Sequence, residues 1–231
     1  MKKEGLKIEN IPAILWGEKS NKVYIYVHGK LSSKEEALGF AEKAIRKGYQ
    51  VLSFDLPEHG ERTKENYPCT AWNGVHDLGI IESYVRQGWS DIYLYGSSLG
   101  VYFSLLAYKD SPIRKSLFLS PILDMKHLIK NMMKWFNVSE QMLRAKKEIP
   151  TPMGETLDWD YYCFVKENPI NKWSVPTAIL YGSDDNLTER EVVESFSKQF
   201  NCNLTVLEDG EHWFHTEQQL TFLDKWLDEH I

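Results

Sequence analysis

The chain has 231 residues, of which 42% are hydrophobic and 26% are charged, and its formal net charge is −6. A chain of this length can bury one extensive core, and the length favours one domain over two. The acidic balance, together with the lack of a Lys/Arg-rich run interleaved with aromatic residues, argues against a nucleic-acid partner.

Cysteine use and hydropathy favour an intracellular protein. Cys69, Cys163 and Cys202 lie far apart without a C-x-x-C motif, which is typical of a reducing compartment and predicts no disulfide or metal framework. No apolar run of signal-peptide length precedes Glu9 and Asn10. No segment approaches the roughly 20 consecutive apolar residues of a membrane span. We therefore expect a cytoplasmic protein with no membrane span.

Strand and helix signals alternate along most of the chain, which is typical of βαβ units in a largely parallel sheet. Residues 6–16 come first and are compatible with one or two antiparallel edge strands. Further strands are expected at residues 23–27, 50–54, 91–95, 115–119, 177–181 and 204–207. Helices are expected at about residues 33–47, 71–87, 101–109, 189–199 and 217–229. Ser33 can cap the first of these helices, and the last carries an apolar face of Leu220, Leu223, Trp226 and Leu227.

The segment at residues 122–175 has helical periodicity but no strand signal. Fifty residues are few for an independent core, so this segment is interpreted as a helical lid insertion over the sheet. The chain as a whole, residues 1–231, is then a single domain.

The strongest chemical signal is Gly96-Ser97-Ser98-Leu99-Gly100, which directly follows an expected strand and opens an expected helix. A sharp turn of this pattern holds its central residue in a strained conformation and lifts the side chain above the sheet. Ser98 is therefore the candidate nucleophile, and the amide of Leu99 points at the same reacting atom. Ser97 lies off the centre of the pattern and is expected to serve packing or the helix start.

A serine hydroxyl is a poor nucleophile at neutral pH, so it needs a base and a group that orients the base. The strand at residues 177–181 runs into Asp184 and Asp185, at the strand end where open α/β sheets place their sites. The next strand, at residues 204–207, runs into a loop that contains His212. His212 is the candidate base, while its competitor His215 is expected to begin the last helix.

These motifs resemble those of the α/β-hydrolase superfamily, and the resemblance covers nearly the whole chain. Five motifs carry it in chain order, each at an expected strand end: residues 28–29 (HG), 55–60 (DLPEHG), 96–100 (GSSLG), 182–185 (GSDD) and 210–212 (GEH). The resemblance implies an α/β fold with a mostly parallel, doubly wound central sheet flanked by helices.

The resemblance also implies roles for particular residues. In family members the acid usually lies three residues after the glycine of its loop, which selects Asp185 over Asp184. The second oxyanion donor is the amide after the His-Gly pair, here that of Lys30, beside the amide of Leu99. Family members often have a further glycine at this point, where this chain continues with Lys30. We expect the lysine side chain to be solvated.

The histidines at positions 28 and 59 also lie near strand ends. In family members such residues usually support loop structure, so His28 and His59 are assigned no catalytic role.

The expected activity is hydrolysis of a small or medium carboxylic ester through an acyl-enzyme. His212 takes the proton of Ser98, Asp185 fixes the imidazole tautomer, and the amides of Leu99 and Lys30 hold the oxyanion. This chemistry needs no metal or organic cofactor. A thioesterase, an amidase or peptidase, and a carbon–carbon bond hydrolase would share these residues. A non-catalytic ligand sensor with the same fold is the alternative from another class.

Substrate specificity is expected to lie in the insertion. Residues 125–136 are rich in methionine and aromatic side chains, which suit an adaptable acyl pocket, although the same face could simply pack the insertion onto the sheet. The expected pocket residues are Met132, Met133, Trp135, Phe136 and Trp213. The expected partner is a small-molecule acyl substrate, and the sequence indicates no particular oligomeric state.

Overall fold

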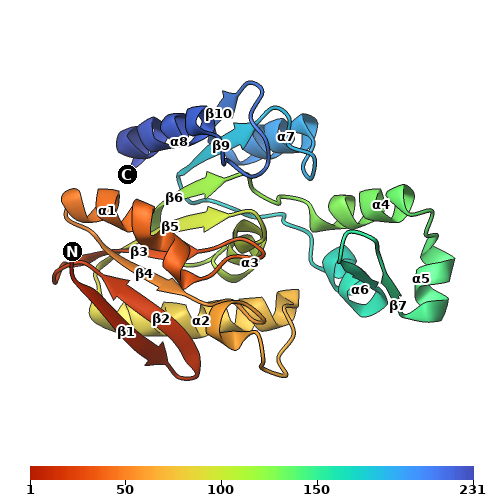
Figure 1. Ribbon diagram of the computed structural model, residues 1–231, viewed down its shortest axis with the longest axis horizontal. Helices are drawn as coiled ribbons and strands as arrows, with labels where there is room; N and C mark the ends of the chain where they lie inside the picture. The colour runs from red at the N-terminus through yellow and green to blue at the C-terminus, as the bar shows by residue number, and fades with distance from the viewer.

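The computed structural model describes residues 1–231, and an eight-stranded sheet runs through its centre (Figure 1). The spatial order of the strands is β1-β2-β4-β3-β5-β6-β9-β10. Their bounds are β1 (Lys3–Ile8), β2 (Ile11–Trp16), β3 (Lys22–Val27), β4 (Gln50–Phe54), β5 (Asp91–Ser97), β6 (Ile113–Leu119), β9 (Thr177–Gly182) and β10 (Asn203–Leu207). In this sheet β2 pairs antiparallel with both of its neighbours, β1 and β4, and every other pair of strands is parallel. The predicted fold class is confirmed.

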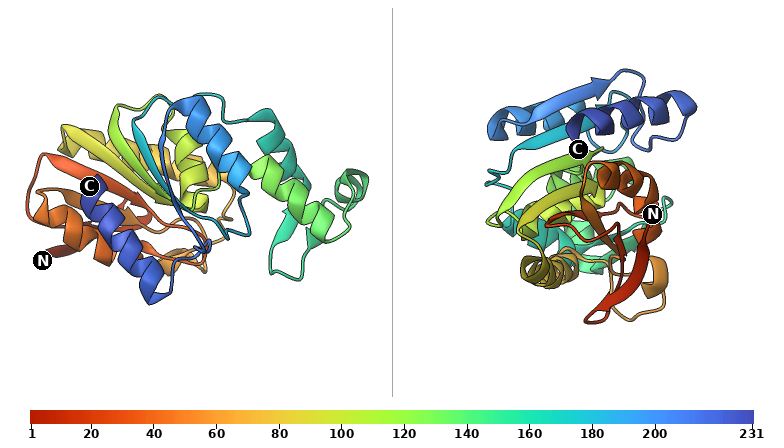
Figure 2. Two further views of the ribbon diagram at one scale, coloured as in Figure 1. Left: turned by 90° about the horizontal axis from the view of Figure 1, so that it is seen from above. Right: turned by 90° about the vertical axis from the view of Figure 1, so that its left-hand side faces the viewer.

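Helices cover both faces of the sheet because its central strands are apolar on both sides (Figure 2). The helices are α1 (Leu38–Arg46), α2 (Ala71–Gly88), α3 (Leu99–Ala107), α4 (Met125–Trp135), α5 (Glu140–Lys146), α6 (Trp159–Glu167), α7 (Arg190–Phe200) and α8 (Glu217–His230). Phe40 of α1 and Trp226 of α8 belong to the core of one face. Leu78 of α2, Phe103 of α3 and Phe196 of α7 belong to the core of the other.

Two details of the expected helices differ in the structure. Ser33 makes no capping hydrogen bond, because the chain first forms a 3₁₀ turn, Lys34–Ala37, before α1 begins. Leu220 is 47% exposed and is not part of the packed face of α8. Gln219 occupies the buried position instead, because its side chain completes a capping box with Thr216.

The inserted segment (residues 122–175) contains α4, α5 and α6 and extends beyond the carboxyl ends of the strands (Figure 1; Figure 2). It also contains a short hairpin of β7 (Glu148–Pro150) and β8 (Thr156–Asp158). The prediction of no strand in this segment was therefore wrong. Strands of three residues are too short to produce a recognisable alternation of polar and apolar residues.

No helix of the chain combines the length and apolar composition needed to cross a bilayer.

Candidate active site

Ser98 lies at the turn between β5 and α3 with φ 47° and ψ −118°, a left-handed conformation that is strained for a residue with a Cβ. Its amide donates to the Leu119 carbonyl at 3.0 Å, which ties the turn to the end of β6. Gly100 permits the turn, because a Cβ there would lie 2.4 Å from the His28 carbonyl oxygen and 2.5 Å from that of Val27. The first turn of α3 therefore packs directly against the end of β3.

The structure joins Ser98, His212 and Asp185 in one chain of hydrogen bonds. Ser98 Oγ lies 2.8 Å from His212 Nε2, and His212 Nδ1 lies 2.7 Å from Asp185 Oδ2. The Asp185 side chain is fully buried, whereas that of His212 is 15% exposed. The imidazole thus has one nitrogen on a buried carboxylate and the other on the serine hydroxyl.

Backbone contacts between two loops bring the acid and the histidine together. The Asp184 amide donates to the Gly210 carbonyl at 2.8 Å, and the Ser183 amide donates to that of Leu207 at 2.9 Å. A Cβ on Gly182 would lie 2.3 Å from the Gly210 oxygen. Only glycine at position 182 allows this approach of the loops that follow β9 and β10.

The carboxylate of Asp185 is oriented by backbone donors. Its Oδ1 accepts hydrogen bonds from the amides of Leu187 at 2.8 Å and Thr188 at 3.0 Å. Oδ2 is left to accept the Nδ1 proton of His212, and this tautomer leaves Nε2 free to accept the proton of Ser98. The geometry is that of a general base oriented by a fixed carboxylate.

The competing residues lie outside this chain of hydrogen bonds. Asp184 is exposed, and its side chain contacts only Ser183. The His215 ring is exposed and stacks on Trp213 with ring centroids 4.9 Å apart. His215 does not begin the last helix as expected, because Thr216 caps α8 and the helix starts at Glu217.

The two candidate oxyanion donors lie on either side of Ser98. A Cβ on Gly29 would lie 3.2 Å from the Cβ of Ser98, so the loop after β3 contacts the candidate nucleophile. The amide of Lys30, the next residue, donates to no group within the protein. Leu99 is the first residue of α3, where an amide has no acceptor within the helix. Both amides are therefore available to a bound oxygen.

The Lys30 side chain is not simply solvated as the sequence suggested. Its ammonium pairs with Glu155, which lies in the inserted segment between β7 and β8. Nothing in the local sequence connects two residues so distant in the chain, so this contact could not be found from the sequence. It links the candidate oxyanion loop to the inserted segment.

His28 and His59 support loops rather than chemistry. The buried His28 ring accepts a hydrogen bond from the Leu56 amide at 3.1 Å and donates to the Gly29 carbonyl at 2.7 Å. Burial lowers the pKa of His28 to about 4, so the ring is neutral. His59 is buried beside it, with ring centroids 5.2 Å apart.

A buried ion pair supports the same loops and was missed by the sequence analysis. Lys34 Nζ lies 2.8 Å from Asp55 Oδ2, and the Lys34 and Glu61 amides also donate to this carboxylate. Burial alone would lower the pKa of Lys34, but hydrogen bonds to Asp55, Glu61 and Glu35 raise it overall. The aspartate of the DLPEHG motif, Asp55, was the one feature of the sequence that could have pointed to this pair.

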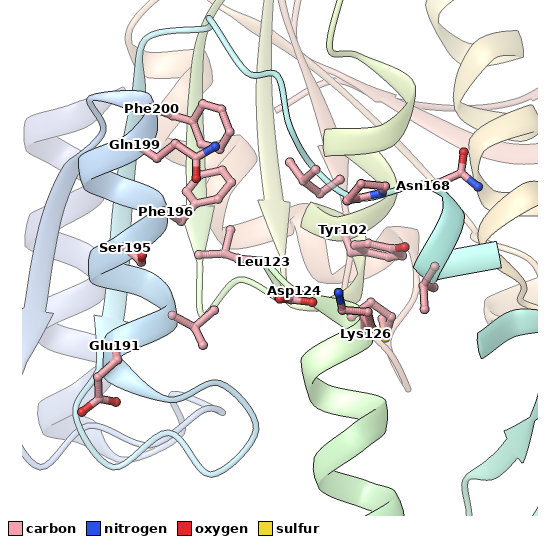
Figure 3. Close-up of a pocket in the computed structure, with 15 residues that line it drawn as sticks. Tyr102, Leu123, Asp124, Lys126, Asn168, Glu191, Ser195, Phe196, Gln199 and Phe200 are labelled. Atoms are coloured by element: carbon pink, nitrogen blue, oxygen red, sulfur yellow. The ribbon is translucent and has the colours of Figure 1, made fainter. Parts of the chain in front are cut away.

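The five residues expected to line a pocket lie in different surroundings. Met133 is buried, Met132 and Phe136 are half-buried, and Trp135 and Trp213 are 46% and 71% exposed. None of them lines the cavity of about 340 Å³ between α3, α6 and α7 (Figure 3). Tyr102, Leu123 and Phe196 line that cavity instead. A shared pocket for the five residues stays a prediction.

An aromatic cluster that the sequence analysis did not assemble joins the sheet domain to the inserted segment. Trp72, at the start of α2, lies 6.0 Å from Tyr161 and 5.6 Å from Phe164 of α6 between ring centroids. Burial raises the pKa of Tyr161 well above 10, and the nearby Tyr102, Cys69 and Glu155 add to the shift. Tyr102, which contributes to this shift, lies on α3 one helical turn after Ser98.

Burial keeps two cysteine thiols protonated, and no cluster of metal-ligating side chains is found. Burial, with Glu58 nearby, raises the pKa of Cys69 to about 12, and burial raises that of Cys202 to about 11, so both thiols stay protonated. No three His, Cys, Asp or Glu side chains are grouped as a metal site would require.

Comparisons with known proteins place the fold. No protein-family model matches the chain. The hydrolase phmG of Phaeosphaeria nodorum is 33% identical over 86 residues, which are 34% of this chain and 20% of that protein. This chain thus matches about a fifth of the length of its curated relative.

Solved structures resemble nearly the whole chain. Esterase Est1E of Butyrivibrio proteoclasticus with ferulic acid bound is 20% identical, with a TM-score of 0.77 over 98% of this chain and 96% of that one. The mouse α/β-hydrolase domain-containing protein 10 is 15% identical, with a TM-score of 0.76 over 99% and 98%. The Pyrococcus furiosus esterase Pf2001 is 21% identical, with a TM-score of 0.69 over 99% and 89%. The chain therefore has the fold of the α/β-hydrolase superfamily.

Proposed function

We propose that the protein is a serine hydrolase that cleaves a small or medium carboxylic ester through an acyl-enzyme. The observation that carries the proposal is the hydrogen-bond chain from Asp185 through His212 to Ser98, with distances of 2.7 and 2.8 Å. The positions of these side chains match the roles of acid, base and nucleophile in this chemistry. The hydrolase and esterase names of the similar proteins add to the support.

The reaction begins when Ser98 Oγ attacks the acyl carbon and its proton passes to His212 Nε2. The carbonyl oxygen gains negative charge and accepts hydrogen bonds from the amides of Lys30 and Leu99, where each donor contributes about 10²–10³ in rate. The buried Asp185 carboxylate stabilises the imidazolium. His212 then protonates the departing alcohol, and a water molecule repeats the sequence on the acyl-enzyme.

The acid part of the ester is proposed to be apolar. Trp72, Tyr161 and Phe164 form an aromatic wall where the inserted segment meets α2. Such side chains bury an apolar acyl group favourably. The inserted segment acts as a lid in this account, since Glu155 connects it to the oxyanion loop at Lys30.

Turnover of p-nitrophenyl esters from acetate to octanoate tests this function. Ser98→Ala should lower kcat/KM by about 10⁴ or more while the melting temperature stays within a few degrees. Ser97→Ala is the matched control and should keep most of the native rate, because it is Ser98 and not Ser97 that hydrogen-bonds to His212. Equal turnover by the native protein and Ser98→Ala would overturn the proposal, and activity on charged acyl groups alone would overturn its substrate class.

A further inference from the structure

Large apolar side chains are unusually exposed around the candidate active site. Apart from the first residue of the chain, the three most exposed are Leu31 at 93%, Trp213 at 71% and Met153 at 53%. No other large apolar side chain beyond residue 1 exceeds 47%. Exposed apolar groups gathered in one place mark a binding surface, whereas scattered ones need no explanation.

All three residues adjoin groups of the proposed active site. Leu31 directly follows Lys30, whose amide is the proposed oxyanion donor, and Trp213 directly follows His212. Met153 lies in the hairpin turn that pairs with Lys30 through Glu155. These residues, Leu31, Met153 and Trp213, are called the apolar rim below.

The conformations of the rim residues offer the fold no evident benefit. Leu31 has φ +62°, a left-handed conformation that glycine and asparagine adopt at lower free energy than leucine. Its side chain buries almost no surface in return. The Trp213 indole is oriented by stacking on His215, with an interplanar angle of 20°. Strain and exposure at the same residue are typical of functional positions.

The proposed reaction indicates which part of the substrate the rim would contact. Once the bond from Ser98 Oγ to the acyl carbon has formed, the carbonyl re-forms and the bond between that carbon and the alcohol oxygen breaks. The proton taken from Ser98 passes from His212 Nε2 to the alcohol oxygen, so the alcohol lies against the His212 ring as it leaves. Trp213 directly follows that histidine in the chain, and its side chain is 71% exposed.

We propose that the apolar rim holds the alcohol part of the ester, and that the preferred substrates carry a bulky apolar alcohol, such as an arylmethyl group, rather than methyl or ethyl. The inference rests on the proposed function, because it names the leaving group of that reaction. It assigns Leu31, Met153 and Trp213 to leaving-group specificity.

The test compares dissolved benzyl butyrate with methyl butyrate, which share one acyl group. The triple variant Leu31→Asn, Met153→Gln, Trp213→Gln should lower the benzyl-to-methyl ratio of kcat/KM by about tenfold, because most of the apolar contact with the benzyl group is lost. The ratio of kcat/KM for methyl hexanoate to that for methyl acetate, which differ only in the acyl group, should change less than about twofold. Leu31→Asn alone should not lower the melting temperature, since asparagine tolerates the left-handed conformation.

The matched control replaces three other exposed apolar side chains, which lie on helices outside the rim. Leu38, Met142 and Leu220 are 46%, 43% and 47% exposed, on α1, α5 and α8. The triple variant Leu38→Gln, Met142→Gln, Leu220→Gln should keep the native benzyl-to-methyl ratio. A similar fall in both triple variants would overturn the inference.

Labelling of Ser98 by a fluorophosphonate separates failure of this inference from failure of the proposed function. If the native protein is labelled and hydrolyses both esters, but the rim variant keeps the native ratio, the inference alone is overturned. If the native protein is neither labelled nor active, both are overturned. If the rim variant loses activity only on emulsified tributyrin, the rim faces a lipid surface and the leaving-group assignment is wrong.

Discussion

Different kinds of interaction hold the inserted segment and the strand-end crevice, which is the name used below for the site of Ser98, Asp185 and His212. In the crevice, buried backbone contacts fix Ser98, Asp185 and His212 to the ends of the strands. The inserted segment instead contacts the rest of the chain through side chains: apolar ones, such as Tyr161 and Phe164 against Trp72, and exposed polar ones, such as the pair of Lys30 and Glu155. If the proposed function holds, the reacting groups are fixed by backbone contacts, while substrate contacts are expected to come from side chains of the inserted segment.

The same contrast appears at the other end of the inserted segment. His127 and Asn131 of α4 both contact the Glu189 carboxylate, at 3.1 and 2.5 Å, next to the start of α7. His127 and Glu189 are 41% and 47% exposed. The exposed contact of His127 with Glu189 is of the kind that contributes little to stability, whereas Asn131 is buried.

The largest effect is expected inside the crevice. Asp185→Asn should lower kcat by about 10⁴, because an amide at this position cannot hold His212 in the tautomer that accepts the Ser98 proton. Asp184→Asn is the control and should stay within about threefold of the native rate, since its carboxylate faces solvent. Steady-state kinetics on one p-nitrophenyl ester measures both. The reverse ranking would mean that the acid is wrongly assigned.

Backbone packing at the crevice is expected to tolerate almost no change. Gly100→Ala should lower the free energy of unfolding by about 3 kcal/mol, because the new methyl group would collide with the carbonyl oxygens of Val27 and His28. Gly154→Ala, in the hairpin of the inserted segment, has open space around it and φ +81°. It should cost only about 1 kcal/mol of conformational strain. Urea unfolding measures both, and equal costs would contradict the contrast between the two regions.

Acid should lower the free energy of unfolding, because the buried His28 ring resists protonation. Its pKa is about 4 in the folded protein, mainly because of burial, and 6.5 is the ordinary value. Between these two pH values His28 therefore binds more protons in the unfolded chain than in the folded protein. The stabilisation that His28 contributes above pH 6.5 is lost as the pH falls towards 4, and the total loss is about 3 kcal/mol. Urea unfolding at pH 7.5 and 4.5 should show a smaller loss in His28→Asn than in the native protein. The exposed His76→Gln is the control, and a native-sized loss in His28→Asn would exclude this origin.

The smallest effect is expected at the link between the regions. Glu155→Gln should change the free energy of unfolding by less than about 1 kcal/mol and kcat/KM by about two- to threefold, because the pair is largely exposed. Addition of 0.5 M NaCl to the native protein should reproduce much of the change, as screening weakens the same pair. Glu148→Gln, at the far end of the hairpin, serves as the control. A loss of more than about tenfold would mean that the inserted segment fixes the reacting groups.

The sequence allowed the sheet, and the strand ends at which the candidate residues lie, to be predicted, because both depend on local patterns. Buried parallel strands appear as short apolar runs, and Gly96, Gly100 and Gly182 mark places where the backbone must approach its neighbours closely. The choice of Asp185 over Asp184 came from family resemblance, and the hydrogen bonds to Leu187 and Thr188 now supply a physical reason for it.

Contacts between distant parts of the chain could not be predicted. The pairing of Lys30 with Glu155 depends on tertiary approach that no local pattern encodes. The hairpin of β7 and β8 was missed because its strands are too short to show periodicity. The exposure of Leu220 arose because Gln219, through its cap, took the buried position on α8.

Peptide mass spectrometry after fluorophosphonate labelling tests the central claim most directly, because it reports which atom is the activated nucleophile. The account predicts one adduct, on Ser98, that is lost in His212→Ala and retained in His215→Ala. Labelling of Ser97 in place of Ser98, or undiminished labelling in His212→Ala, would contradict it.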